Sequence, residues 1–243
     1  MIPLERRETR YGSITIFRRK LSGSIVYDQS GSYQSEADQD GISLAAYVHA
    51  LYDFLLQGGA RNVLMIGCGG GTLATMLARD ARKVTVVDIN SESFELARRY
   101  FALPPQVICC VADGKEYLTS NQTCYDAIVV DAFQGDHMPT YLQTRSFLSL
   151  ASTRLKTAGM LLMNVHVRND GDPAPDTIAE AAAQVWHEVR LLDAPGYYSR
   201  NAIVAAGKVR ALQMPAVRLL PAECAKEIAY ELATSRFRDW RAC

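Results

Sequence analysis

The chain has 243 residues, of which 49% are hydrophobic, and its 26 lysines and arginines equal its 26 aspartates and glutamates. This length and composition suit one large core, and the balanced charge lacks the field that draws a protein to nucleic acid or to an anionic membrane. We therefore expect a small-molecule partner, and neither a nucleic acid nor a membrane partner.

The cysteines and the N-terminal residues indicate the cellular compartment in which the protein is expected. The six cysteines form no C-x-x-C pair, and several lie in apolar runs, where a reduced cysteine acts as a small hydrophobe. The first ten residues are rich in glutamate and arginine rather than apolar like a signal segment. The four histidines lack metal-ligand spacing. We expect a cytoplasmic protein without a bound metal.

The N-terminal segment predicts a small β domain over residues 1–42. Residues 13–17 and 24–27 are rich in β-branched and aromatic types and flank a Ser-Gly turn, which is typical of a β-hairpin. Apolar residues then recur at helical spacing over residues 43–56. This helix opens the second predicted domain, residues 43–243.

Strand and helix patterns alternate through the rest of the chain. Apolar strand segments are expected at residues 63–66, 84–87, 107–111, 127–130 and 160–164. Helical patterns lie at residues 72–79, 91–100 and 142–155, and a helix and a strand pair follow at 177–185, 189–192 and 202–206. This rhythm predicts an α/β fold with a Rossmann-like, methyltransferase-type, doubly wound parallel sheet.

The stretch from residue 63 to Asp88 predicts a nucleoside pocket. Its first strand ends in Gly-Cys-Gly-Gly-Gly at residues 67–71, where no Cβ keeps a ligand from the backbone. The second strand ends at Asp88, whose carboxylate can accept hydrogen bonds from both hydroxyls of a ribose. The alternative is an ordinary strand-to-helix turn and an incidental surface acid.

The glycine spacing indicates which nucleoside binds. Gly67, Gly69 and Gly71 form G-x-G-x-G, and Thr72 stands where a dinucleotide-binding turn has its third glycine. No Gly-Lys-Ser/Thr follows, which disfavours a P-loop. A nucleoside without phosphates, such as S-adenosylmethionine, fits best, and we expect the three glycines to contact it.

Two further strand ends carry candidate residues, because ligands of open α/β sheets bind outside the carboxyl ends of the strands. Asp113 can accept a hydrogen bond from an adenine amino group, and Gly114 lets the ring pass close to the backbone. Asp113 can instead cap the helix that follows. Asp131 would face the reactive carbon of the cofactor and is the candidate catalytic residue; the alternative is an ion-paired acid at a strand end.

The order and spacing of these motifs resemble the spermidine synthase family of aminopropyltransferases over most of the chain. The segments that carry the resemblance are Arg10-Tyr11 with residues 14–17, residues 25–28 with Gln34, residues 98–104, and residues 112–118. The resemblance implies a small N-terminal β domain on a methyltransferase-like core, decarboxylated S-adenosylmethionine as donor and a diamine as acceptor. It also implies a homodimer or higher oligomer formed through the N-terminal domain.

The resemblance also assigns roles to residues by position. Gln34, Asp88 and Asp113 would contact the nucleoside, Asp131 would be the catalytic aspartate, and Tyr197 would line the amine site. The acceptor amine must lose a proton before it attacks a carbon bonded to a sulfonium, and a carboxylate can take or orient that proton.

Several positions depart from the family pattern. Gly70 stands where the family's glycine turn carries an aspartate for the donor ammonium, and Gln134 replaces a second acid, unless Asp136 fills its place. The family's "YQ" pair falls near Leu44-Ala45. Because a buried ammonium without a counter-charge is costly, these departures argue against aminopropyl transfer to putrescine.

Three functions remain open. The first is a spermidine synthase-like transferase that uses decarboxylated or intact S-adenosylmethionine to alkylate a small amine. The second is a methyltransferase that uses intact S-adenosylmethionine, since Gly70 removes a carboxylate that would repel the methionine carboxylate. The third is a nucleoside-binding protein without catalysis. Asp131 and Tyr197 favour an amine acceptor.

Overall fold

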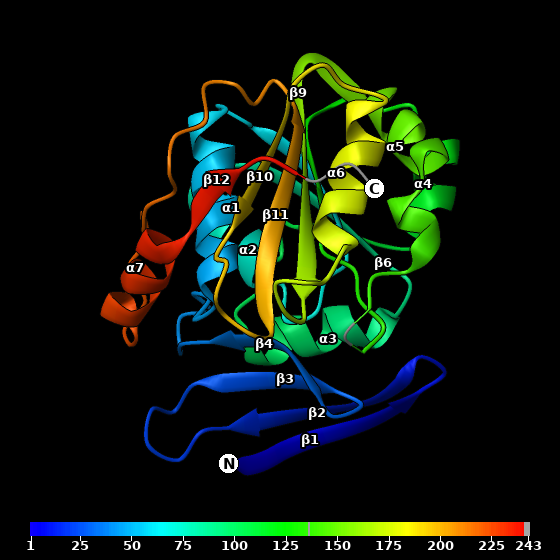
Figure 1. Ribbon diagram of the computed structural model, residues 1–243. Helices are drawn as coiled ribbons and strands as arrows, with labels where there is room; N and C mark the ends of the chain where they lie inside the picture. The colour runs from blue at the N-terminus through cyan, green and yellow to red at the C-terminus, as the bar shows by residue number, and fades with distance from the viewer. Residues whose placement is uncertain (136, 241–243) are drawn as a thin grey trace.

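The computed structural model describes residues 1–135 and 137–240. The chain forms two sheets of four and eight strands. The smaller sheet, made by the first 37 residues, lies across one end of the larger α/β unit (Figure 1).

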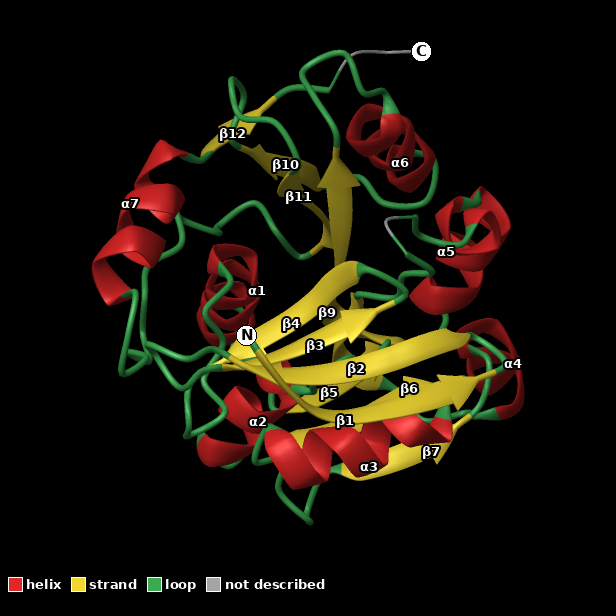
Figure 2. Cartoon of the chain, turned by 90° about the horizontal axis from the view of Figure 1, so that it is seen from below, coloured by secondary structure: helices red, strands yellow, loops and turns green. Residues whose placement is uncertain are grey.

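The N-terminal sheet is an antiparallel meander whose strands pair in chain order. Its strands are β1 (Ile2–Thr9), β2 (Gly12–Arg18), β3 (Ile25–Gln29) and β4 (Ser32–Ala37). Alternate residues of β2, Ile14 and Ile16, point into a small core with Tyr27, Leu96 and Phe101. The predicted hairpin corresponds to β2 and β3, and β1 and β4 extend it on its two sides. Figure 2 shows the four strands side by side.

The larger sheet has the strand order β12-β10-β11-β9-β8-β5-β6-β7. Its strands are β5 (Asn62–Ile66), β6 (Lys83–Asp88), β7 (Ile108–Val111), β8 (Tyr125–Val130), β9 (Leu155–Val167), β10 (Val189–Asp193), β11 (Arg200–Gly207) and β12 (Arg236–Arg238). Strands β5 to β9 are parallel, and the last three join antiparallel. The strand order reverses between β5 and β8, where an open sheet binds its ligand.

Helices cover both faces of this sheet. They are α1 (Ala46–Gln57), α2 (Thr72–Arg79), α3 (Ser91–Tyr100), α4 (Gly114–Ser120), the 3-10 helix η1 (Thr140–Gln143), α5 (Arg145–Ser152), α6 (Ala174–Ala183) and α7 (Ala225–Thr234). Along β5, Val63 and Met65 join the core under α1, α2 and α7, and Leu64 and Ile66 join the core under α4, α5 and α6. Among the described residues, no helix combines the length and apolar character needed to span a bilayer. The predicted doubly wound, methyltransferase-type fold is confirmed.

Some element boundaries differ from those the sequence predicts. The single helix predicted over residues 142–155 is divided into η1 and α5, because the Thr144 side chain accepts the Phe147 N–H and starts a new helix. Strand β9 runs from Leu155 to Val167, longer than predicted at both ends. Helix α7 and strand β12 were not predicted.

Candidate functional site

A cavity of about 560 Å³ lies where the carboxyl ends of β5, β6 and β8 face the N-terminal sheet. This volume is typical of a small-molecule site. The predicted site residues that line it are Gln34, Gly67, Gly69, Asp88, Asp113, Gly114 and Asp131. The structure thus brings most of the candidates to one place. Gly71 and Tyr197 do not line this cavity.

The glycine turn lets two strand ends approach each other. Gly67 has φ +99°, and a Cβ there would lie 2.1 Å from the Asp131 carbonyl oxygen, so only glycine fits. Gly71 is the N-cap of α2, and a Cβ there would lie 3.1 Å from the Leu103 side chain. Gly69, in the same turn, lines the cavity and also lies against Ser35.

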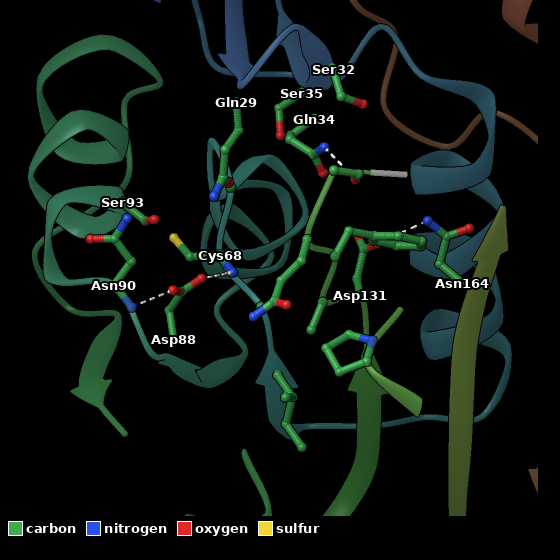
Figure 3. A pocket seen from close by; sticks show the side chains of 18 of the residues that line it. Gln29, Ser32, Gln34, Ser35, Cys68, Asp88, Asn90, Ser93, Asp131 and Asn164 are labelled. Carbon is green, nitrogen blue, oxygen red and sulfur yellow. Dashed lines mark hydrogen bonds between the residues drawn. The ribbon is translucent and has the colours of Figure 1, made fainter. Parts of the chain in front are cut away.

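Asp88 is fixed at the cavity wall by two backbone N–H groups. Its Oδ2 accepts from Cys68 at 2.8 Å and its Oδ1 accepts from Asn90 at 2.7 Å, as Figure 3 shows. Burial raises the pKa of the carboxyl group, and the two hydrogen bonds partly offset this rise. Each oxygen keeps a second lone pair, so Asp88 can still accept hydrogen bonds from ligand hydroxyls.

Asp113 caps the helix that follows it and also lines the cavity. Its Oδ1 caps α4 by accepting the N–H groups of Lys115 and Glu116, at 2.8 and 3.1 Å. Its Oδ2 accepts from the Tyr141 hydroxyl, and both side chains line the cavity. The neighbouring Gly114 allows α4 to begin close to Ile66, 2.5 Å from where a Cβ would lie. The cap therefore holds Asp113 at the cavity wall.

Asp131 follows β8 and is held by two neutral side chains. Asn164 Nδ2 donates to its Oδ1 at 2.8 Å, and the Tyr47 hydroxyl lies 3.4 Å from its Oδ2, with Asp131 and Asn164 facing each other in Figure 3. Burial raises the pKa of Asp131, and these two contacts act in the opposite direction. None of the ion pairs among the described residues involves Asp131. The ion-paired alternative therefore does not describe this acid.

Sequence reasoning missed the two residues that hold Asp131. Asn164 is 2% exposed and ends the strand predicted at residues 160–164. The sequence did contain a signal for Asn164, because a polar residue at the end of an apolar strand is a candidate site residue. Tyr47 offered none, because it fits the apolar spacing of α1 and only the crossing of α1 over the sheet brings its hydroxyl to Asp131.

The N-terminal sheet closes the cavity through two residues of β4. Gln34 donates through Nε2 to the Gly135 carbonyl at 3.0 Å, and Ser35 Oγ accepts the Gly70 N–H at 3.0 Å. A Cβ at Gly70 would lie 2.8 Å from the Phe101 ring and 3.0 Å from the Ser35 Cβ. The turn therefore has no acid at Gly70 and no room for one. Asp136, the possible substitute for the second acid, lies outside the described residues.

Tyr197 lies in the loop between β10 and β11 and is 47% exposed. It lines a second cavity of about 690 Å³ rather than the first one. The two cavities share Tyr47, Ser199 and Asn201 as lining residues. The structure therefore places Tyr197 near the Asp131 site but not in contact with it.

The arrangement suits proton transfer beside a bound nucleoside. Asp131 is a half-buried acid, and Asp88 and Asp113 lie on other strand ends of the same cavity. Within residues 1–135 and 137–240, no three side chains of His, Cys, Asp or Glu gather as metal ligands.

The proteins that are similar in sequence to this chain have related names. The family described as "Methyltransferase domain" matches residues 63–159. A polyamine aminopropyltransferase of Chromobacterium violaceum is 30% identical over 186 residues, which cover 73% of this chain and 69% of that protein. A Bifidobacterium longum protein named "Probable polyamine aminopropyl transferase" is 29% identical over 170 residues, 67% of this chain but only 37% of that longer protein.

Solved structures agree on the fold. A probable spermidine synthase from Corynebacterium glutamicum matches with a TM-score of 0.79 and 19% identity, covering 97% of this chain and 90% of that one. A spermidine synthase solved with the transition state analogue AdoDATO matches with a TM-score of 0.70 and 18% identity, covering 96% and 87%. On its relatives and its fold, the chain belongs to the spermidine synthase family of transferases, the polyamine aminopropyltransferases.

Proposed function

We propose that this protein binds decarboxylated S-adenosylmethionine in the first cavity and transfers its aminopropyl group to an amine. The observation that carries the proposal is Asp131, an acid held by Asn164 and Tyr47 beside a cavity of nucleoside size. The names of the relatives, and the AdoDATO complex of a structural neighbour, support the same reaction.

The chain's own residues divide the work between binding and proton transfer. Asp88 accepts hydrogen bonds from the ribose, and Asp113 with Gly114 receives the adenine. When bound, the sulfonium donor supplies an electrophilic carbon whose leaving group is a neutral thioether. Asp131 accepts the proton that the attacking nitrogen loses as the new C–N bond forms and the C–S bond breaks. Its raised pKa suits a base that must hold this proton.

Putrescine is not the acceptor that we propose. The glycine turn has Gly70 where the family has an aspartate, and Phe101 and Ser35 leave no room for a side chain there. The loop after β8 has Gln134 in place of an acid. The ammonium groups of donor and acceptor would thus lack two counter-charges of the family pattern, and burial of an ammonium without a counter-charge is costly.

Methyl transfer from intact S-adenosylmethionine is the second candidate. Gly70 favours it, because no carboxylate at the glycine turn repels the methionine carboxylate. The methyltransferase domain match over residues 63–159 supports it as well. Both candidate reactions use the same nucleoside site, so the form of S-adenosylmethionine that binds more tightly distinguishes them.

Calorimetric titration with decarboxylated S-adenosylmethionine, intact S-adenosylmethionine and methylthioadenosine tests the proposal. We expect the decarboxylated donor to bind more tightly than the intact one. A preference for the intact donor would support methyl transfer instead, and binding of none of the three would exclude both candidates.

Asp131→Asn tests the role of the base. We expect it to keep nucleoside affinity within about twofold and to lower turnover by at least about 100-fold, since an amide cannot accept the proton. Unchanged turnover would remove Asp131 from its role. Asp40→Asn, which changes an exposed acid outside the cavity, is the matched control.

A further inference from the structure

The phenol of Tyr141 lies against Asp113 at the first cavity. Tyr141 belongs to η1, lines the cavity together with Asp113, and is 38% exposed. Its hydroxyl donates to Asp113 Oδ2. The two residues come from different segments of the chain, since Asp113 follows β7 and Tyr141 follows β8. At this point the cavity wall is therefore built by a carboxylate and a phenol in direct contact.

This contact fixes the direction of the Tyr141 hydroxyl hydrogen. An ionised carboxylate offers only acceptors, so the phenol is the donor of the pair. Partial burial, followed by the hydrogen bond to Asp113, raises the pKa of Tyr141 above its ordinary value, and the phenol keeps its hydrogen at neutral pH. Because that hydrogen points to Asp113 Oδ2, the phenolic oxygen has only lone pairs left for a ligand.

Asp113 is held in place independently of Tyr141. Its Oδ1 accepts the N–H groups of Lys115 and Glu116, at 2.8 and 3.1 Å. Its Oδ2 accepts from the Tyr141 hydroxyl, and a carboxylate oxygen can accept a second hydrogen bond. The side chains of Asp113 and Tyr141 thus present two adjacent acceptors to the cavity, and neither has a hydrogen to donate to a ligand.

Two adjacent acceptors match an amino group that carries two hydrogens. The exocyclic amino group of adenine has one hydrogen on each side of its C–N bond, so it can donate to Asp113 and to Tyr141 at the same time. A keto oxygen in the same place would face two acceptors and leave them without a donor. An amino group that carries a methyl group would keep one hydrogen and would press the methyl group against the second acceptor. The pair therefore favours an unsubstituted amino group.

We propose that Tyr141 is a specificity-determining residue of the nucleoside site, where its oxygen accepts the second amino hydrogen of adenine and disfavours nucleosides with a substituted amino group. This inference rests on the proposed function, in which Asp113 receives the adenine. It adds a residue from the segment after β8 that contacts the same base. Asp113 would reject a keto base by itself, and Tyr141 would reject substitution of the amino group.

Calorimetric titration of the full chain with methylthioadenosine, its N6-methyl derivative and methylthioinosine tests this inference. We expect wild type to bind the N6-methyl derivative at least about tenfold more weakly than methylthioadenosine, as the loss of one hydrogen bond causes. Tyr141→Phe keeps the ring and removes the acceptor, so its two affinities should lie within about threefold of each other. Methylthioinosine should bind at least about tenfold more weakly than methylthioadenosine to both proteins, because Asp113 stays in place.

Tyr117→Phe is the matched control. Tyr117 lies on α4, its hydroxyl is hydrogen-bonded to Tyr125 and Asn121, and it does not line the cavity. This variant should keep the wild-type preference for methylthioadenosine over its N6-methyl derivative, and circular dichroism of each variant checks that the fold is kept.

The outcomes separate this inference from the proposed function. If wild type binds methylthioadenosine and its N6-methyl derivative equally, or if Tyr141→Phe keeps the full preference, the inference is overturned while the nucleoside site stands. If wild type binds none of the three nucleosides, the proposed function fails together with the inference.

Discussion

At the scale of single residues, Asn164 sets how easily Asp131 loses its proton. Its amide donates to the carboxylate at 2.8 Å, and among the described residues the Tyr47 hydroxyl is the other side-chain group with a hydrogen bond to it. Burial raises the pKa of Asp131, and removal of a donor to the charged form raises it further. Asn164 is thus a positioning residue that acts through Asp131.

Asn164→Ala should therefore move the acid limb of the kcat/KM profile to higher pH. The sign follows from the base: activity needs ionised Asp131, and a higher pKa means that protonation begins at a higher pH. Asn164→Gln retains an amide donor and serves as the conservative variant, with a smaller shift. A fall in kcat/KM with an unmoved acid limb would show that Asn164 acts only through packing.

Gly70 illustrates how one position limits the donor site. Phe101 is fully buried, and its ring would lie 2.8 Å from a Cβ at residue 70. We expect Gly70→Asp to destabilise the fold by about 1–3 kcal/mol, as overpacking does, and not to raise affinity for the decarboxylated donor. Urea denaturation and calorimetry measure the two effects. A stable variant with tighter donor binding would contradict this interpretation of the closed turn.

At the scale of elements, ion pairs attach β1 to α3. Glu5 accepts from Arg7 at 2.6 Å and from Arg99 and Tyr100 at 2.8 Å each, and Arg7 also reaches Glu92 at 2.9 Å. Figure 2 shows α3 running beside β1. The Tyr100 hydroxyl, followed by Arg7 and Arg99, lowers the pKa of Glu5 to about 2.

Glu5→Gln should lower Tm near neutral pH by about 2–4 °C, because surface charge pairs are screened by solvent and salt. A depressed folded-state pKa stabilises the protein above the unfolded pKa, and this contribution disappears as the pH falls toward 2. The difference in Tm between variant and wild type should therefore shrink across that window. Glu8→Gln, whose partner Arg6 is exposed, is the control. An equal effect of both variants would argue against this attachment.

The elements also show what the sequence can and cannot predict. The unit β5-α2-β6 was predicted because apolar runs, glycines and a terminal acid follow one another locally. Strand β1 was missed because its charged residues pair with α3, about 90 positions away. The N-cap of helix α7 is Cys224, which has φ +58° and makes no side-chain cap, so the helix lacks the usual start signal.

The same distinction applies to the candidate site. The strand-end acids could be named because parallel strands deliver their carboxyl ends to one edge. Their roles in binding and catalysis stay predictions. Tyr47 could not be named, since it reaches Asp131 only through the packing of α1 across the sheet.

At the scale of the whole molecule, the first cavity joins the two sheets. Gln29, Gln34 and Ser35 come from the N-terminal sheet, and Asp88, Asp113 and Asp131 follow or end strands of the larger one. The contacts from Ser35 to Gly70 and from Gln34 to Gly135 are among the polar contacts that link the N-terminal sheet to the larger unit at this cavity. A nucleoside that touches both walls would add further contacts and make the sheets open together rather than separately.

Hydrogen exchange with and without methylthioadenosine measures this coupling. We expect the nucleoside to slow amide exchange both at residues 67–71 and in β4, and to leave α6, which does not line the cavity, unchanged. Ser35→Ala removes the acceptor of the Gly70 N–H. In this variant the protection of residues 67–71 should persist while that of β4 weakens, because the direct contact from the turn to the strand is lost. Protection confined to residues 67–71 in wild type would mean that the nucleoside touches one sheet only, and that the N-terminal sheet opens independently of the site.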